Sequence, residues 1–352
     1  MMQIQDLLTQ SVQKRASDLH LSAGLPAMLR IDGSLHLYSD QVLTHEDIVS
    51  AVENIMSPLQ RDHFKQVLEC DFSFEVPGVS RFRVNVYNQI RGISVAFRAI
   101  PSRIPSLEDL GAPAIFSDFA SRPRGLVLVT GPTGSGKSTT LAAMIHELNR
   151  TQAKHVLTIE DPVEFLYVPD RCLINQREVG GQTLSFANAL RAAMREDPNV
   201  ILVGEMRDLE TIRLAITAAE TGHLVFATLH TSGAAKAIDR IIDVFPAEEK
   251  SVVRSMLSES LTAVISQVLC KRKQGEGRVA AYEIMVGSAA VRNLIRESKV
   301  AQLYSAIQTG SNVGMQTLDQ SLTKLVQQGQ ISTEEAAAKA RYPENFGGAK
   351  ES

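Results

Sequence analysis

The sequence has few of the residues that cross-link or anchor small domains. It contains no tryptophan, three cysteines and 5% aromatic residues among 352 positions. The cysteines, Cys70, Cys172 and Cys270, stand far apart and form no CxxC pair. This pattern indicates neither a zinc site nor a disulfide framework, and it fits a reducing cytosol.

Long apolar runs and a strong charge of one sign are also missing. No stretch approaches the ~20 apolar residues that a membrane helix needs, and the opening MMQIQDLLTQSVQKRASDLH lacks the apolar core of a signal peptide. We therefore expect a cytoplasmic chain whose association with a membrane is peripheral. The net charge of -3 gives no indication of a nucleic-acid partner, and none is expected.

The residues that are present are typical of a globular protein with two domains. Hydrophobic residues make up 44% and charged residues 21% of the chain, and its length allows two domains. The first part combines a helical period over residues 4–14 with strand alternation over 28–38 and 71–100. We expect a small α+β domain over residues 1–100.

The pattern changes after a proline-rich stretch. PSRIPSLEDLGAP holds three prolines and a glycine, which predicts a linker over residues 101–113. Beyond it, continuous apolar runs alternate with helical patterns. The runs are LVLVT from Leu126, HVLTI from His155, VILV from Val200 and LVFATL from Leu224. We expect a parallel α/β domain over 114–352, mostly helical from about residue 246 to 340.

One motif with clear chemistry lies where the first apolar run meets a helix. The pattern GxxxxGK[ST] is formed by Gly131, Pro132, Thr133, Gly134, Ser135, Gly136, Lys137 and Ser138, and Thr139 comes next. Glycines let backbone N–H groups turn inward around an anion, and a helix N-terminus adds partial positive charge. Lys137 then places a cation at the β- and γ-phosphates, and Ser138 offers a hydroxyl to Mg²⁺. The motif predicts binding of ATP with Mg²⁺.

Hydrolysis also needs acidic groups, and two later apolar runs end in them. Glu160, Asp161 and Glu164 follow the second run, and Glu205 and Asp208 follow the third. Parallel strands bring their carboxyl ends to one edge of a sheet, so we expect Glu164 and Glu205 to meet the phosphate loop there. Helix capping or solvated loop charge is the competing interpretation for the other three acids.

Two histidines flank the fourth apolar run. His230 ends the run at the edge where ligands bind, and an imidazole there can sense the γ-phosphate. A structural role is the alternative for His230. His223 precedes the run, and the residues alone favour a structural role for it.

Four motifs in this order make the chain similar to a known superfamily. GPTGSGKSTT, TIEDPVE, VILVGEMRD and TAAETGHLVFATLHT correspond to a Walker A motif, an Asp box, a Walker B motif and a His box. The chain resembles the secretion ATPases that power type II secretion, type IV secretion and type IV pili. The segments AVRNLIRE and MQTLDQS further resemble the pilus retraction ATPases, and the similarity covers nearly the whole chain.

The resemblance implies a homo-hexameric motor in which ATP hydrolysis drives pilus retraction, and thereby pilin disassembly and twitching motility. Each subunit would join a PAS-like N-terminal domain to a RecA-like ATPase domain. The ring would work at the cytoplasmic face of the inner membrane. Its partner would be the inner-membrane platform protein of the pilus, with a paralogous retraction ATPase as a second candidate partner.

The resemblance also assigns roles to single residues. Lys137 and Ser138 would bind phosphate and Mg²⁺, and Glu205 would hold the metal or its water. Glu164, in the Asp box, would orient the attacking water, although the roles of the two glutamates can be exchanged. His230 and His223 would be the His-box residues.

Two further features follow from the same resemblance. Arg83 and Arg98 match positions at which the N-terminal domain of one subunit reaches the nucleotide of the next, where they would stabilise transition-state charge. The residues alone indicate only solvated strand faces. The Walker B motif carries Gly204 before Glu205, so a single acid stands there and the Asp box takes a larger share of the metal and water chemistry.

Other functions remain open on the sequence. An accessory retraction ATPase is one alternative. Pilus assembly and type II secretion ATPases are others, but they usually carry a long N-terminal extension and a four-cysteine zinc element, which this sequence does not have. A nucleotide-gated scaffold that scarcely turns over is a second class. A DNA or RNA translocase is a third, although the small basic cluster Lys271-Arg-Lys273 is better explained as a solvated loop.

Overall fold

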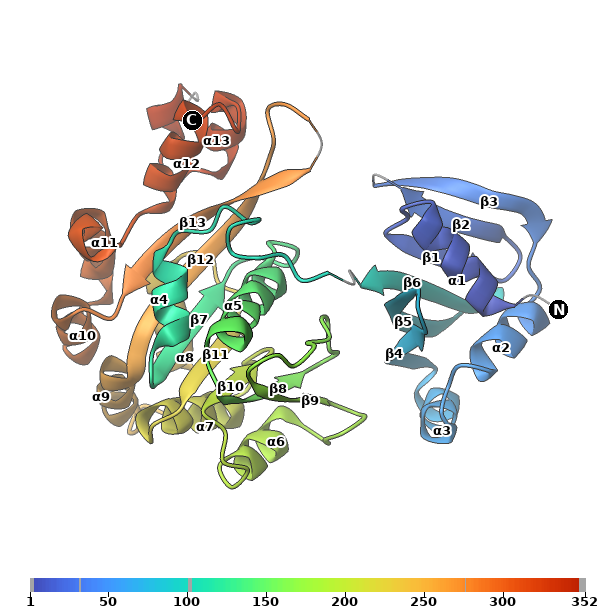
Figure 1. Ribbon diagram of the computed structural model, residues 1–352, viewed down its shortest axis with the longest axis horizontal. Coiled ribbons are helices and arrows are strands. Elements are labelled where there is room, and N and C mark those ends of the chain that lie inside the picture. The colour runs from blue at the N-terminus through green and yellow to red at the C-terminus, as the bar shows by residue number, and fades with distance from the viewer. Residues whose placement is uncertain (1–2, 32, 101–102, 276, 348–352) are drawn as a thin grey trace. The chain divides into compact units, whose positions relative to one another are not determined.

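A computed structural model describes residues 3–31, 33–100, 103–275 and 277–347 (Figure 1). The chain divides into two compact units. The first comprises Met1–Arg103 with Pro162–Leu166, and the second comprises Ile104–Asp161 with Tyr167–Ser352. Of the linker predicted over 101–113, residues 101 and 102 lie outside the described part. No helix within the described residues has both the length and the hydrophobicity to cross a bilayer.

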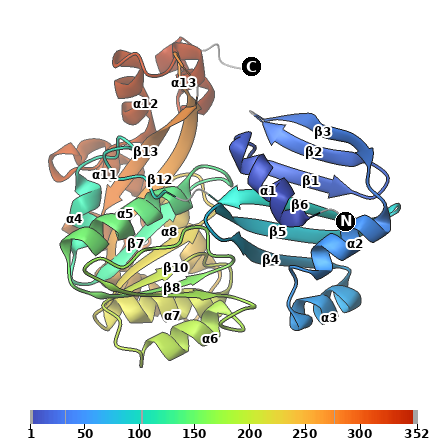
Figure 2. The same cartoon turned by 45° about the vertical axis from the view of Figure 1, so that its right-hand side comes forward.

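The first unit is built on a six-stranded antiparallel sheet with the order β3-β2-β1-β6-β5-β4. The strands are β1 (Asp18–Ser22), β2 (Pro26–Ile31), β3 (Ser34–Val42), β4 (Glu69–Val76), β5 (Ser80–Gln89) and β6 (Gly92–Ile100). The helices are α1 (Ile4–Gln13), α2 (His45–Glu53) and α3 (Pro58–Val67). In both views α1 lies over one face of this sheet (Figures 1 and 2).

Alternation along the strands produces the core of the first unit. Phe82, Val84 and Val86 of β5 share one buried face, and Phe97 of β6 and Leu8 of α1 belong to the same cluster. The predicted helix near the start of the chain and the predicted antiparallel strands are confirmed. β1 and α3 were not expected, because β1 is only five residues long and α3 buries none of its own residues.

The second unit is built on a seven-stranded sheet with the order β13-β12-β7-β11-β10-β8-β9. The parallel strands are β7 (Gly125–Thr130), β8 (His155–Glu160), β9 (Leu173–Glu178), β10 (Val200–Val203), β11 (Leu224–Leu229) and β12 (Leu261–Lys271), and β13 (Arg278–Val286) is antiparallel. The four strands predicted from apolar runs are β7, β8, β10 and β11, so the parallel sheet is confirmed.

Helices cover both faces of this sheet. They include α4 (Ile115–Ser121), α5 (Lys137–Thr151), α6 (Phe186–Ala193), α7 (Leu209–Glu220) and α8 (Ala234–Asp243). Figure 2 shows α4 and α5 on one side of the sheet and α6 and α7 on the other. The strand order explains this arrangement, because right-handed crossovers that reverse direction along a sheet place their helices on opposite faces.

The region expected to be mostly helical from residue 246 to 340 contains two long strands, β12 and β13. β12 pairs with the interior strand β7 and is buried on both faces along much of its length. Periodicity does not distinguish such a run from a buried helix, which explains why the two strands were not predicted. Helices surround the pair: α9 (Lys250–Ser260), α10 (Ala289–Arg296), α11 (Leu303–Thr309), α12 (Leu318–Gln327) and α13 (Thr333–Lys339).

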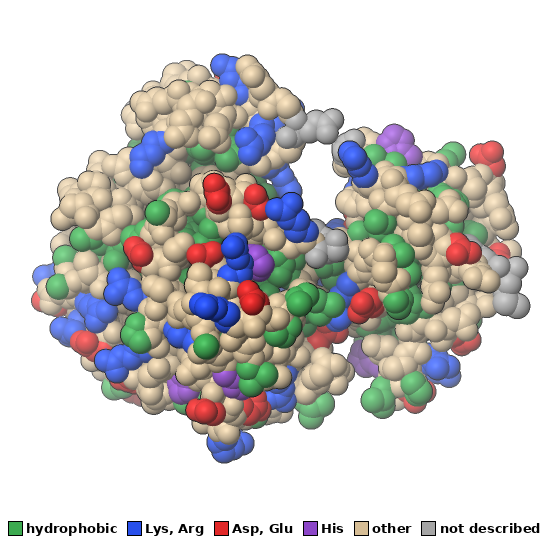
Figure 3. Space-filling model, viewed as in Figure 1, with side chains coloured by type: hydrophobic (Ala, Val, Ile, Leu, Met, Phe, Trp, Pro, Cys, Tyr) green, Lys and Arg blue, Asp and Glu red, His purple; other side chains and the backbone are tan. Residues whose placement is uncertain are grey.

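Charged side chains of both signs are interspersed over the second unit on the face that Figure 3 shows. Some charged side chains of this unit form ion pairs. Arg213 lies 2.6 Å from Glu249, and Lys250 lies 2.9 Å from Asp243. Mixed charge of this kind gives a weak field at a distance.

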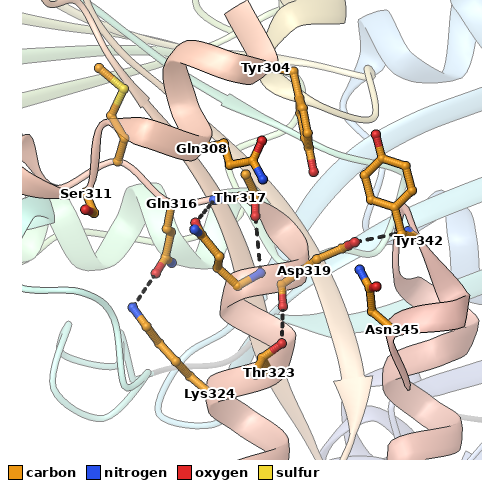
Figure 4. Close-up of a pocket in the computed structure, with 12 residues that line it drawn as sticks. Tyr304, Gln308, Ser311, Gln316, Thr317, Asp319, Thr323, Lys324, Tyr342 and Asn345 are labelled. Atoms are coloured by element: carbon orange, nitrogen blue, oxygen red, sulfur yellow. Dashed lines mark hydrogen bonds between the residues drawn. The ribbon is translucent and has the colours of Figure 1, made fainter. Parts of the chain in front are cut away.

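The buried carboxylate of Asp319 connects α12 to the segment that contains Arg341 and Tyr342. Asp319 accepts hydrogen bonds from the backbone N–H groups of Arg341 and Tyr342, at 2.7 and 3.0 Å. The Arg341 guanidinium lies 3.9 Å from the centre of the Tyr304 ring, a cation–π contact. Asp319, Tyr304 and Tyr342 stand around a cavity of about 500 Å³ (Figure 4). Its lining comes from α11, α12 and the segments beside them.

All three cysteines are buried and free of disulfide bonds. Burial raises the pKa of the Cys70 and Cys172 thiols, and it raises the pKa of Cys270 to about 11. The three side chains are therefore neutral at pH 7, and they pack as small apolar groups.

One ion pair of the first unit gives a pH-dependent contribution to stability. The Asp18 side chain is 7% exposed and lies 2.8 Å from Nε of Arg98. Burial opposes ionisation of Asp18, but the hydrogen bond from Ser17 and the hydrogen bond and charge of Arg98 outweigh it, so the pKa of Asp18 lies below its ordinary value. Folding therefore favours the ionised carboxylate.

We predict that Asp18→Asn lowers the free energy of unfolding of the first unit in a pH-dependent way. The contribution of the ionised carboxylate is complete above the unfolded-state pKa of about 3.9 and is lost as the pH falls through the lower folded-state pKa. The difference between wild type and variant should therefore be constant near neutral pH and shrink below about pH 4. Urea unfolding followed by hydrogen exchange in β1 and β6 measures it. A difference that stays constant into the acid range contradicts the prediction.

Candidate active site

The phosphate loop predicted from GxxxxGK[ST] connects β7 to α5. Gly131, Gly134 and Gly136 have φ angles of 144°, 76° and 86°, in the region that side chains with a Cβ rarely adopt. Gly136 is the N-cap of the fifteen-residue α5 and supplies no side-chain cap. N–H groups at the start of a helix, together with a turned loop backbone, are suited to bind an anion. The predicted sequence of strand, loop and helix is confirmed.

The Lys137 side chain is folded back over this loop. It is 8% exposed, and its ammonium donates to the carbonyl oxygens of Gly131 and Pro132 at 2.9 and 3.0 Å. A buried ammonium needs such acceptors, because burial without them is costly. These bonds hold the cation within the loop, and Ser138 follows it half-buried on the first turn of α5.

Backbone hydrogen bonds fix the position of Glu205 at the end of β10. The carbonyl of Gly204 accepts a hydrogen bond from the Thr228 hydroxyl, and the N–H of Met206 donates to the Thr228 carbonyl at 3.1 Å. Both residues that flank Glu205 are therefore tied to β11. These two hydrogen bonds hold the Glu205 side chain at the carboxyl edge of the sheet.

Gly204 explains why the Walker B motif has a single acid. A Cβ at this position would lie 3.2 Å from both the Glu160 Cα and the Ile159 carbonyl oxygen. Contacts this short require the β8 backbone to shift by a few tenths of an ångström, while the Gly204 N–H donates to the same Ile159 oxygen at 2.8 Å. An aspartate in place of Gly204 is therefore disfavoured by packing.

The Glu205 carboxylate lies between two basic side chains. Its Oε1 is 3.0 Å from Nε2 of His230 and 2.5 Å from Nε of Arg207, and the Glu205 side chain is 19% exposed. The hydrogen bond to Glu205 and the charge of that carboxylate raise the pKa of Arg207. The structure thus brings together Glu205 and His230, as predicted. It adds Arg207, which lies inside the VILVGEMRD motif but was not singled out.

The sheet order places these groups at the same edge as the phosphate loop. β7, β11 and β10 are parallel neighbours, so the loop, His230 and Glu205 all follow carboxyl ends. Neighbouring strands lie ~4.8 Å apart, so Glu205 and the loop are separated by ~10 Å across the strands. This spacing suits a triphosphate with its metal ion.

Two of the other acids, Glu160 and Asp208, have structural partners. The buried Glu160 accepts a hydrogen bond from the Thr158 hydroxyl at 2.6 Å. Asp208 is the N-cap of α7 and accepts the Thr211 N–H at 2.8 Å. The capping interpretation of Asp208 is confirmed.

His223 lies at the opposite end of β11 from His230. Its Nδ1 is 3.0 Å from the Ala218 carbonyl oxygen at the end of α7. The six residues of β11 separate the two rings by ~20 Å. Within one chain the structure does not bring His223 to the phosphate loop.

Three predicted site residues belong to the first unit. Glu164 lies in the segment Pro162–Leu166 that groups with this unit. Nε of Arg83 is 3.9 Å from Asp71, and Arg98 pairs with Asp18. Each arginine thus has an acidic partner on a neighbouring strand. Their placement at a nucleotide remains a prediction.

The donor set suits Mg²⁺ bound together with phosphates. The described residues contain no group of three or more His, Cys, Asp or Glu side chains that could hold a metal by themselves. Nucleotide-bound Mg²⁺ does not need one, because phosphate oxygens and waters supply most of its ligands. The Ser138 hydroxyl and the Glu205 carboxylate are the hard oxygen donors that Mg²⁺ prefers.

Comparison with known proteins agrees with this geometry. Residues 1–338 match the family model described as type II/IV secretion system protein. The chain is 62% identical over 345 residues to the type IV pilus retraction ATPase PilT of Pseudomonas aeruginosa, covering 98% of this chain and 100% of that protein. It is 58% identical over 340 residues to the twitching motility protein of Neisseria gonorrhoeae, covering 97% and 91%.

A solved structure shares the fold over the whole length. The crystal structure of the pilus retraction motor PilT with bound ADP has a TM-score of 0.91 to this chain at 46% identity, covering 98% of this chain and 99% of that one. The resemblance noted in the four motifs is confirmed. The chain is therefore an ATPase that belongs to the type II/IV secretion system protein family.

Proposed function

We propose that the chain is the subunit of a hexameric motor that hydrolyses ATP to retract type IV pili, by disassembling pilin, and so drives twitching motility. The observation that carries the ATPase part is the convergence of the Lys137 loop with the Glu205–His230 pair on one sheet edge. Retraction is supported by two relatives that match nearly the whole chain, a pilus retraction ATPase and a twitching motility protein.

The site residues divide the chemistry among them. The loop N–H groups and Lys137 bind the β- and γ-phosphates, and Ser138 with Glu205 holds Mg²⁺, which neutralises phosphate charge when bound. His230 contacts Glu205, so it can transmit the presence or absence of the γ-phosphate to that carboxylate. Glu164 orients the attacking water, with the exchange of roles between the two glutamates as the alternative.

The remaining roles depend on the assembly. We propose a PAS-like domain over residues 1–100, a linker over 101–113 and a RecA-like ATPase domain over 114–352. Arg83 and Arg98 of one subunit reach the nucleotide of the next, and His223 takes part only through such a neighbour. The ring docks on the inner-membrane platform protein at its cytoplasmic face, with a paralogous retraction ATPase as a further partner.

We predict that Lys137→Ala abolishes ATP hydrolysis, because the phosphates lose their only loop cation. Steady-state phosphate release by the purified chain measures the effect, with loss of at least ~10³-fold expected for a group that stabilises transition-state charge. Lys236→Ala, which removes an exposed lysine of α8, is the matched control and should retain wild-type turnover. Hydrolysis that persists in Lys137→Ala removes the site assignment.

We predict that Arg83→Ala impairs hydrolysis with little loss of stability, since its pair with Asp71 is exposed. Mixing Arg83→Ala with Glu164→Ala subunits should partly restore turnover. When the two variants are mixed one to one and assemble at random into rings, about a quarter of the interfaces place an intact Arg83 of one subunit against an intact Glu164 of the next. A titration of the two variants against each other tests this, and zero recovery at every ratio counts against a site shared between subunits.

Deletion of the gene distinguishes retraction from assembly. The retraction hypothesis predicts cells that keep surface pili, in excess of wild type, but do not spread by twitching. Electron microscopy of pili with a stab-agar motility assay measures both properties. Bald cells would instead indicate an assembly ATPase, and normal twitching would indicate an accessory retraction ATPase.

A further inference from the structure

A single buried amide joins the phosphate loop to the neighbouring strand. Gln267 lies on β12 and is 2% exposed. Its Nε2 donates to the Ser135 carbonyl at 2.7 Å, and its Oε1 accepts from the Thr140 hydroxyl at 2.7 Å. One side chain thus binds the middle of the loop and the first turn of α5 at the same time.

The chemistry of the two partners fixes the orientation of this amide. The Ser135 carbonyl can only accept a hydrogen bond, so the NH₂ group of Gln267 must face it. The Thr140 hydroxyl can then donate to the remaining oxygen. Both bonds lie within buried surroundings, where an unpaired polar group is costly.

The backbone of β12 also approaches the loop closely. A Cβ on Gly131 would lie 2.3 Å from the Gln267 carbonyl oxygen, and a Cβ on Gly136 would lie 2.9 Å from Gln267 Nε2. Gly131 is therefore required by contact with the β12 backbone as well as by its φ angle, and Gly136 leaves room for the Gln267 amide. The loop and Gln267 fit each other as one packed unit.

The bond to Ser135 has a directional consequence for the loop. In a planar trans peptide the carbonyl and the following N–H point in opposite directions. Gln267 draws the Ser135 carbonyl toward β12, so the N–H of Gly136 points away from β12. A fixed N–H direction is what an anion-binding loop needs before the anion arrives.

We propose that Gln267 is a positioning residue that holds the phosphate loop in its nucleotide-binding conformation. The inference rests on the nucleotide site proposed above. The backbone N–H groups that Gln267 orients contact phosphates in the ground state and in the transition state alike, so their ordering contributes uniform binding, in contrast to the Lys137 ammonium. Loss of Gln267 should therefore raise KM for ATP and Kd for ADP while kcat changes little.

The test compares Gln267→Leu and Thr140→Val with wild type in the full chain. Equilibrium binding of ADP in the presence of Mg²⁺ and steady-state ATP hydrolysis are measured for each protein. Gln267→Leu should raise Kd and KM ~10-fold, the size expected for one buried hydrogen-bonded group, with kcat within about twofold. Thr140→Val, which frees only one end of the amide, should raise both by about threefold.

The double variant and a matched glutamine provide controls. Gln267→Leu combined with Thr140→Val should bind ADP no more weakly than Gln267→Leu alone, because both substitutions break the same link between β12 and the phosphate loop. Gln316 lies on the other side of β13 and donates to the Tyr282 carbonyl at 3.1 Å. Gln316→Leu should lower Tm but leave Kd for ADP at the wild-type value.

Three outcomes separate the possibilities. Raised Kd and KM with preserved kcat in Gln267→Leu and Thr140→Val support positioning. A lower Tm with unchanged Kd and KM in both variants overturns it, since Gln267 then acts only in folding. Wild-type protein that does not bind ADP overturns the nucleotide site itself and Gln267 with it. If Gln267→Leu does not fold, the Kd of Thr140→Val decides.

Discussion

The Lys137 ammonium is buried in a loop that must keep it hydrogen-bonded, and the second unit is organised around that requirement. Two loop carbonyls accept from it, which is possible only because glycine backbone turns those carbonyls inward. The same turns expose N–H groups at the start of α5. A glycine-rich loop is flexible and needs outside support to hold one conformation, and β12 supplies it through close backbone contact and through the Gln267 amide.

The other half of the site depends on the spacing between β8 and β10. Gly204 is small enough for the two strands to lie against each other, and Thr228 ties the residues on both sides of Glu205 to β11. The result is one well-placed carboxylate instead of two. His230 and Arg207 share that carboxylate, so any Mg²⁺ that binds Glu205 competes with two cationic or hydrogen-bonding groups. Metal binding and the rearrangement of this pair are therefore coupled.

The local patterns and the sheet edge where the parallel strands end were predictable, whereas the contacts made by β12 and by the first unit were not. Glycine spacing revealed the phosphate loop, and apolar runs revealed β7, β8, β10 and β11, because both are short-range patterns. β12 was missed because a strand buried on both faces reads like a buried helix. Gln267 was missed with it, since no spacing links position 267 to position 135. Glu164 and the two arginines belong to the first unit, so a single chain cannot decide their role.

The three cysteines have a practical consequence. Their thiols are buried, and burial raises the pKa of each above its usual value. Thiolate is the form that reacts with maleimides and disulfides, so the native chain offers little background to such reagents. A cysteine introduced on an exposed position of each unit would be modified selectively. Pairs of spin labels or fluorophores attached there would follow the separation of the two units through the nucleotide cycle without removal of any native cysteine.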